Sequence, residues 1–203
     1  MATPPKGNDL RVRRTRQQLQ RAFLELLHEK GFLAMSVQEI AERAMVNRGT
    51  FYAHFADKYM LADALVRERF QHVLEKRLPP TAGWNSETLH ELVEAVFNHV
   101  RTFHGHCQPV ETINPLFERS VQEELATLVT TWLKEGSTAR WRVPVETIAQ
   151  AVSWSIVGTA ITWSQSPDGK SAREMADDLL LVINEGVAHL ASDAPSISSH
   201  PSK

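Results

Sequence analysis

The sequence predicts an all-α fold, with a three-helix domain at the front and a helical bundle behind it. Apolar residues recur with helical period in almost every segment after residue 10, and no segment alternates with the period of a strand hairpin. Pro79, Pro80 and Gly83 interrupt this pattern and mark a break between the two parts. We therefore expect helices joined by short turns along most of the chain.

The front domain is predicted from one apolar stripe and a series of capping residues. The stripe runs from Leu19 to Leu27, and Gly31 is expected to end that helix. Ser36 and Glu39 form the pattern of a capping box, which predicts the start of a second helix.

Two more helices are expected close behind. Asn47 is a good N-cap for a third helix that ends near Phe55, and Asp57 is a good N-cap for a fourth.

The second part is predicted to hold about four more helices. Their expected bounds are 86–104, 110–133 with an interruption near Pro115, 144–164, and a last helix that a capping box of Ser171 and Glu174 opens. As domains, we expect residues 10–60 as the front domain and 61–191 as the second, with disordered tails at 1–9 and 192–203.

Composition indicates an ordinary globular protein, with 42% hydrophobic and 23% charged residues among 203. The longest apolar run, Leu179–Ile183, is far shorter than the roughly 20 residues of a membrane span. The first ten residues lack the apolar core of a secretory signal. Cys107 is the only cysteine, which fits a reducing compartment, so we expect a cytoplasmic protein that meets no membrane.

Charge is distributed unevenly along the chain. Residues 1–60 hold 10 Lys and Arg against 6 Asp and Glu, whereas the remaining residues carry 12 basic and 18 acidic side chains. A basic front on an acidic body favours contact of the front domain alone with a polyanion.

The segment from Ser36 to Phe55 has the pattern of a helix-turn-helix, two short helices joined by a three-residue turn. This geometry places a second, recognition helix in the major groove of double-stranded DNA. Phe51 and Phe55 are spaced to face the core, which leaves the polar side chains between them on the outer face.

Several residues of this front domain are candidates for contacts to DNA. Arg48 can make a bidentate contact to guanine, Thr50 can meet a thymine methyl or a phosphate, and Gly49 allows close approach of the backbone. Tyr52, His54 and Lys58 are expected near phosphates. The remaining candidates are Arg14, Thr15, Ser36 and Asn47.

The front domain closely resembles the TetR family (tetracycline-repressor-like regulators) from about Arg13 to Leu65. The most specific match is Gly-Thr-Phe-Tyr-x-His-Phe-x-x-Lys over 49–58, and the resemblance implies that Tyr52 and Lys58 touch phosphates. Asn47 stands where a serine is commoner in the family, and Met45-Val46 replaces a more usual Gly-Val or Ala-Val pair.

The resemblance also implies what the second domain does. Family members carry a helical ligand-binding and dimerisation domain, so we expect a homodimer through the last two helices, with Ile148–Trp163 and Met175–Leu190 in that role. Val152, Ile156 and Ala160, with Gly158 and Ala151 as small residues, are expected to allow close helix packing there. The implied function is a regulator, in habit a repressor, that binds a palindromic operator, is released by a small molecule and is not an enzyme.

The effector is expected to be largely apolar. Phe97, Val100, Phe117 and Trp154 are the candidates for lining its cavity, although an aromatic at helical spacing is more often part of a core.

One other cluster could carry chemistry. His99, His104, His106 and Cys107 have metal-binding side chains at a helix end, where a histidine is also favourable to the helix dipole. The alternative function is therefore a small-molecule-binding or metal-dependent helical protein or enzyme, in which the helix-turn-helix is only structural. No cofactor is expected, because no Gly-rich phosphate loop or catalytic motif is present.

Overall fold

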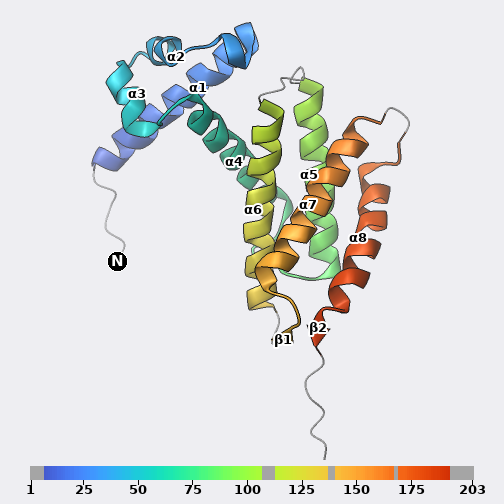
Figure 1. Ribbon diagram of the computed structural model, residues 1–203. Coiled ribbons are helices and arrows are strands. Elements are labelled where there is room, and N and C mark those ends of the chain that lie inside the picture. The colour runs from blue at the N-terminus through green and yellow to red at the C-terminus, as the bar shows by residue number, and fades with distance from the viewer. Residues whose placement is uncertain (1–6, 107–112, 137–139, 167–168, 193–203) are drawn as a thin grey trace, which may run out of the picture. The chain divides into compact units, whose positions relative to one another are not determined.

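The computed structural model describes residues 7–106, 113–136, 140–166 and 169–192, and this part of the chain forms eight helices and one pair of two-residue strands (Figure 1). The predicted all-α class is confirmed. The chain divides into two compact units, one formed by residues 1–68 with 109–117 and the other by 69–108 with 118–203. We call them unit 1 and unit 2.

Unit 1 contains helices α1 (Gly7–Ala34), α2 (Val37–Arg43), α3 (Arg48–His54) and the first half of α4 (Lys58–Arg77). Helix α1 begins three residues before the expected start of the front domain at residue 10. Gly31 does not end the helix outright: it introduces a kink, with φ of 78° and ψ of 167°, and a short helical piece follows to Ala34. Glycine adopts this backbone conformation at little steric cost.

The predicted caps of unit 1 are confirmed. Ser36 and Glu39 form a capping box at the start of α2, and the side chain of Asn47 caps α3. Asp57 Oδ1 accepts a hydrogen bond of 2.8 Å from the backbone N–H of Met60 in the first turn of α4. Each cap satisfies a backbone N–H that has no partner within its helix.

Unit 2 contains α5 (Ser86–His106), α6 (Ile113–Glu135), α7 (Val145–Ser164) and α8 (Ala172–Ala188), of which α6 also contributes its first residues to unit 1. Pro115 lies in the first turn of α6, where its missing N–H costs no helical hydrogen bond, so the expected interruption does not occur. Strand β1 (Arg140–Trp141) pairs antiparallel with β2 (Ala191–Ser192). The capping box of Ser171 and Glu174 at α8 is confirmed.

Helix α5 supplies the centre of the core of unit 2. It packs along α7 and α8, which lie beside it in Figure 1. The fully buried residues of α5 follow helical spacing and are Leu89, Leu92, Val93, Val96, Phe97 and Val100.

Helix α7 differs from expectation in the face that it leaves exposed. Val152, Ile156 and Ala160 are buried within the protomer, so they pack its own core. The outer face of α7 carries Ala151 and Gly158, the small residues named for that packing, together with Trp154, which is 48% exposed.

None of the described helices combines the length and the apolar character needed to cross a membrane.

Candidate nucleic-acid interface

Helix α3 holds its position through two buried aromatic rings. Phe51 is fully buried, Phe55 is 5% exposed, and their ring centroids lie 6.0 Å apart. The opposite face of α3 carries Arg48, Gly49 and Tyr52, all exposed, while His54 is half-buried. The predicted division of α3 into a core side and an outer side is confirmed.

Asn47 organises the start of α3. Its Oδ1 accepts hydrogen bonds from the backbone N–H of Thr50, at 2.7 Å, and from the Thr50 hydroxyl, at 3.0 Å. A Cβ added at Gly49 would lie 3.2 Å from the same oxygen. Glycine at this position therefore makes room for the cap, a reason for Gly49 that does not involve DNA.

Arg48 and Tyr52 form a pair on the outer face. Arg48 Nη2 donates to the Tyr52 hydroxyl at 3.0 Å, and the guanidinium lies 5.5 Å from the centroid of the Tyr52 ring. One helical turn separates the two residues, so the exposed face presents a guanidinium and a phenol held together. These groups suit a guanine edge and a phosphate oxygen.

Ser36 is engaged in its own capping box. Its backbone N–H and its hydroxyl both donate to Glu39 Oε2, each at 2.9 Å. A hydrogen bond from Lys30, together with those from Ser36, lowers the pKa of Glu39 to about 2. The carboxylate thus occupies the start of α2, where the sequence predicts a phosphate, and the contact of Ser36 with DNA stays a prediction.

Lys58 also has partners within unit 1. Its Nζ donates to the carbonyls of Phe32, Leu33 and Met35, at 3.0, 3.4 and 2.8 Å. It lies 4.7 Å from the centroid of the Phe32 ring. The ammonium group therefore satisfies carbonyls where α1 ends, and a phosphate would have to compete with them.

The candidate residues near the start of α1 differ from the neighbouring Arg16, which has a partner within unit 1. Arg14 is exposed and Thr15 half-buried, so both remain available as candidates. Arg16 is bonded to Glu68 of α4. Sequence reasoning missed this partner because 52 residues separate the two and no local pattern connects them.

The candidates for the effector cavity occupy unlike positions. Phe97, Val100 and Phe117 are buried to 1% exposure or less, and the Phe97 ring packs 5.3 Å from that of Trp163. Trp154 lies on the surface of α7. Phe117 belongs to unit 1 and the other three to unit 2, and the lining of an effector cavity by these side chains stays a prediction.

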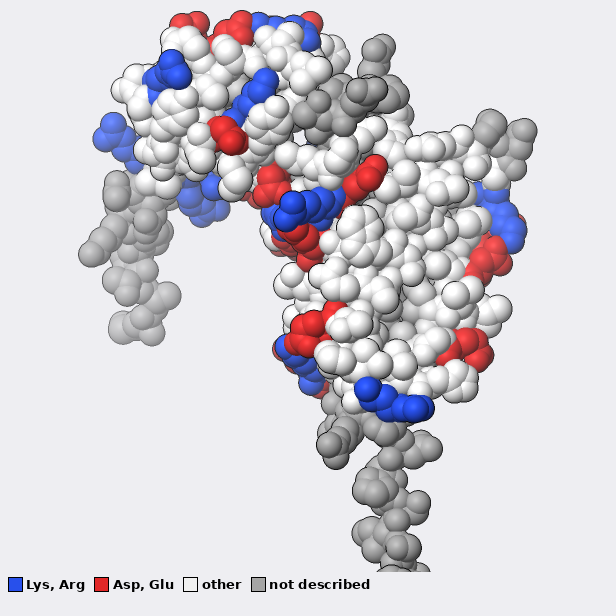
Figure 2. All heavy atoms as spheres, in the orientation of Figure 1, with Lys and Arg blue, Asp and Glu red and all other residues white. Residues whose placement is uncertain are grey.

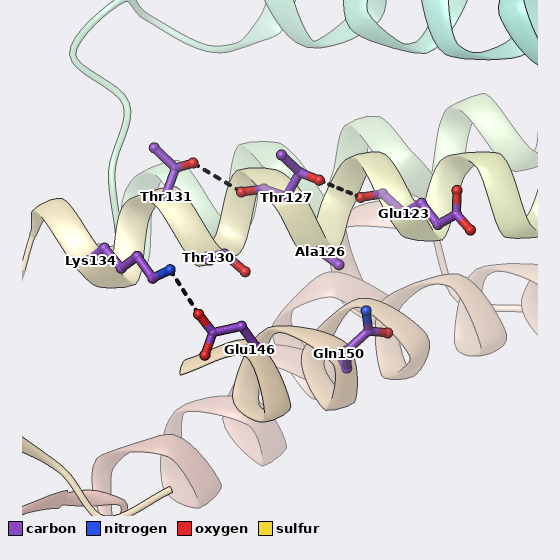
Figure 3. Close-up of a pocket in the computed structure, with 8 residues that line it drawn as sticks. All are labelled: Glu123, Ala126, Thr127, Thr130, Thr131, Lys134, Glu146 and Gln150. Carbon is purple, nitrogen blue, oxygen red and sulfur yellow. Dashed lines mark hydrogen bonds and ion pairs between the residues drawn. The ribbon is translucent and has the colours of Figure 1, made fainter. Parts of the chain in front are cut away.

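An open groove lies elsewhere in unit 2, between α6 and α7 (Figure 3). It has a volume of about 410 Å³, and an ion pair of Lys134 with Glu146 at 2.7 Å spans it. Gln150, which also lines it, accepts a 2.7 Å hydrogen bond from the buried Gln122. The remaining lining residues are Glu123, Ala126, Thr127, Thr130 and Thr131.

The histidine and cysteine cluster is only partly described. His99 is 8% exposed and packs on Phe70, and His104 Nδ1 lies 2.7 Å from Ser164 Oγ. Cys107 and the side chain of His106 fall outside the described residues. Within the described ranges, no three His, Cys, Asp or Glu side chains are grouped as a metal site would require.

Acidic and basic side chains of unit 2 are mostly interspersed. On the face that Figure 2 shows, acidic and basic side chains of the described residues lie next to one another. Several of them are exposed ion pairs, such as Arg119 with Glu123 at 2.7 Å. Such pairs give little net field for steering a charged ligand.

Comparison with known proteins points to one group of regulators. The family model described as "Bacterial regulatory proteins, tetR family" matches residues 21–65. The HTH-type transcriptional regulator TcmR of Streptomyces glaucescens is 38% identical over 104 residues, 48% of this chain and 45% of that protein. The chain spans 19% to 57% of the length of the curated relatives considered.

Solved structures share this fold over most of the chain. A TetR transcriptional regulator from Streptococcus agalactiae has a TM-score of 0.56 at 21% identity, covering 87% of this chain and 97% of its own. Thermus thermophilus FadR, a TetR-family repressor solved with lauroyl-CoA, has a TM-score of 0.51 at 21% identity, covering 91% and 100%. At this identity the likeness concerns the fold.

Proposed function

Because this chain belongs to the TetR family of bacterial regulatory proteins, we propose that it is a repressor that binds a palindromic operator as a homodimer and is released by a small molecule. The membership itself makes the chain a transcriptional regulator rather than an enzyme. Repression, binding of a palindromic operator as a homodimer and release by a small molecule are the parts that we propose. Its place of action would be the cytoplasm, on the chromosome.

The observation that carries the proposal is the exposed pair on α3. Arg48 and Tyr52 stand on the face opposite Phe51 and Phe55, on a helix whose start Asn47 fixes. A short helix anchored on one side and capped at its start presents its polar side chains in one orientation, as reading of a major groove requires. We assign base reading to Arg48 and a phosphate contact to Tyr52.

The other candidates support this pair. Arg14 and Thr15 on α1 are proposed to grip the DNA backbone, and His54 to donate to a phosphate. Asn47, Gly49 and Thr50 order the start of α3, and Thr50 also offers its methyl group. Ser36 and Lys58 are proposed to support this pair by ordering the starts of α2 and α4.

The homodimer is proposed to form through α7 and α8. Trp154 is 48% exposed, and Leu181 and Val182 on α8 are 67% and 70% exposed. Gly158 is exposed on the same face of α7 as Trp154, since four residues separate them, and it would let a second helix approach closely. Burial of such side chains against a second copy is favourable by about 25 cal/mol for each Å² of apolar surface removed from water.

The effector is proposed to act within unit 2 and to be largely apolar. Phe97 and Val100 are fully buried on α5, so a ligand among them would have to part α5 from α7. FadR of Thermus thermophilus, which shares the fold, was solved with the amphipathic lauroyl-CoA. Such a ligand would bias the helices of the dimer toward an arrangement that no longer fits the half-site spacing.

Selection of an operator from a random duplex pool tests the proposal. We expect wild-type protein to enrich a palindrome and to bind it with an affinity that falls steeply with salt. Arg48→Ala should relax the base preference, with a loss of about 1–3 kcal/mol on the selected palindrome, while Tyr52→Phe should weaken binding to all duplexes alike. A protein that enriches no sequence at any salt concentration would contradict the proposed function.

A second arm of the same assay addresses release. Lauroyl-CoA serves as a first amphipathic probe, and displacement of wild type from the selected duplex would support effector control. Displacement should be absent with coenzyme A alone, because only the acyl chain can enter an apolar interior.

A further inference from the structure

Glu68 lies at the point where α4 leaves unit 1, and its carboxylate accepts two hydrogen bonds from α1 and makes an ion-pair contact with Arg16. Oε1 accepts from Arg16 Nε at 3.1 Å and lies 2.9 Å from Arg16 Nη2. Oε2 accepts from Gln20 Nε2 at 2.6 Å. Gln20 is only 8% exposed, so one of the two hydrogen-bond donors is a buried amide with a fixed position.

Arg16 connects this junction to the recognition helix. Its guanidinium lies 4.9 Å from the centroid of the Phe55 ring. Phe55 is the C-cap of α3, and its backbone N–H donates to the carbonyl of Phe51. One arginine thus touches the end of α3 while one edge of its guanidinium, together with the neighbouring amide of Gln20, holds Glu68.

Helix α4 is tied to α1 at a second place, where Lys58 donates to three carbonyls near the end of α1. Ten residues separate Lys58 from Glu68, which is about 15 Å along a helix. Two ties at this spacing fix the angle between α1 and α4. They also fix α3, because Phe55 lies against Arg16 at one of the ties.

We propose that Glu68 is a positioning residue for DNA binding: through Arg16 and Gln20 it holds α1, α4 and the end of α3 in the arrangement that presents Arg48 and Tyr52. The inference rests on the proposed function. It also assigns Arg16 a different task from its exposed neighbour Arg14, since the charge of Arg16 is used inside the domain.

The sign of one substitution separates positioning from simple electrostatics. Glu68→Gln removes a negative charge, and on electrostatic grounds alone this should raise affinity for a polyanion. If Glu68 positions the recognition helix, the same variant should bind more weakly. Glu75→Gln is the matched control: it removes the same charge from the same helix, and Glu75 is exposed with a 3.7 Å contact to His72.

Hydrogen exchange on the full chain without DNA is the deciding measurement. We expect amides of α3 to exchange about fivefold faster in Glu68→Gln than in wild type, as loss of one hydrogen bond's worth of stabilisation would give. Amides of α5 serve as the reference, so a general loss of stability, which would accelerate both helices, is recognised. Glu75→Gln should exchange as wild type in both helices.

Binding to the wild type's selected duplex is the second measurement. Glu68→Gln should lose about fivefold in affinity, and Glu75→Gln should keep its affinity or gain. Exchange of α3 that is equal in the two variants, or acceleration equal to that of α5, overturns the inference. If wild type binds no duplex, the proposed function fails, and exchange alone then decides whether Glu68 orders α3.

Discussion

The side chain of Lys58 performs a task that the resemblance to a family does not imply. The motif around it suggests a phosphate contact, whereas its Nζ satisfies carbonyls of Phe32, Leu33 and Met35. Charge-assisted hydrogen bonds of this kind contribute more than neutral ones. The residue type could be singled out from the sequence, but its partners could not, because they lie 23 to 26 residues away on another helix.

Replacement of Lys58 by methionine should therefore destabilise unit 1 even without DNA. We expect a loss of about 1–3 kcal/mol in the free energy of unfolding, because three carbonyls lose a charged donor. Urea unfolding followed by circular dichroism measures it. Lys76→Met, at an exposed site of the same helix, should change the stability by less than about 0.5 kcal/mol. Equal stability of the two variants would contradict the structural role of Lys58 and leave contact with DNA as its task.

Met45 departs from the family resemblance in its residue type, whereas Lys58 keeps the residue type and differs in its contacts. It lies in the turn between α2 and α3 with φ of 55°, and its side chain is 86% exposed. A side chain with a Cβ pays a steric penalty in this region of backbone space. The resemblance implies that glycine or alanine is more usual here, and the positive φ gives a physical reason for glycine.

At the scale of elements, the predictions that rest on neighbouring residues are confirmed. Ser36, Asn47 and Ser171 cap the helices that they were expected to cap, because a cap joins atoms two or three residues apart. Predictions that depend on packing between segments far apart in the sequence were less accurate. The outward face of α7 is such a case: Val152 and Ile156 are buried against α5 and its neighbours, and sequence periodicity alone does not tell an inner apolar face from an outer one.

The cap of α3 yields a prediction for that element. Asn47→Ala removes the acceptor of two hydrogen bonds from Thr50 and should reduce the stability of unit 1 by about 1 kcal/mol. Asn47→Ser retains a capping oxygen and should lose much less. Thermal unfolding of the two variants provides the measurement, and a loss in both of the same size would mean that the side chain acts by packing rather than by capping.

At the scale of the whole molecule, two units with different charge and different cores are joined through α4. The helical period of apolar residues predicts both cores, because a buried stripe such as Leu89 to Val100 recurs every three or four residues within one segment. The effector site could not be predicted in the same way. Aromatic residues at helical spacing fill a core and line a cavity equally well, and Phe97 fills the core.

The outer face of α7 and α8 should control association. Val182→Asp places a charge where 70% of an apolar side chain is exposed, and a buried unpaired charge in an interface costs several kcal/mol. We expect this variant to be a monomer by sedimentation velocity at concentrations where wild type is a dimer. Leu33→Asp, at a 65% exposed leucine of unit 1, should remain a dimer. A dimer in both variants would exclude α8 from the interface.

A buried imidazole makes the stability of unit 2 depend on pH. Burial, and to a smaller extent the charge of Arg69, lower the pKa of His99 to about 4 from 6.5. Between these values the unfolded chain binds a proton that the folded chain does not, so stability is full above pH 6.5 and falls as the pH drops toward 4. From pH 7 to pH 5 the loss due to His99 is about 2 kcal/mol.

Urea titrations of wild type and His99→Gln at pH 7 and pH 5 test this dependence. The variant has no titrating group at position 99, so its stability should fall by about 2 kcal/mol less than that of wild type between the two values. Parallel pH dependence in the two proteins would show that the imidazole is protonated in the folded state at pH 5.

The pairing of β1 with β2 has a consequence for how this chain could be altered. Residues just before α7 and just after α8 are hydrogen bonded, and Trp163 Nε1 donates to the carbonyl of Lys170 at the opposite end of the helix pair. The segment between the strands, which packs along α5, begins and ends at one place. It is thereby a cassette with adjacent ends, which could be exchanged for the corresponding hairpin of a paralogue. If the proposed dimer forms through α7 and α8, such an exchange would change which copies associate with one another and leave the helices of unit 1 as they are.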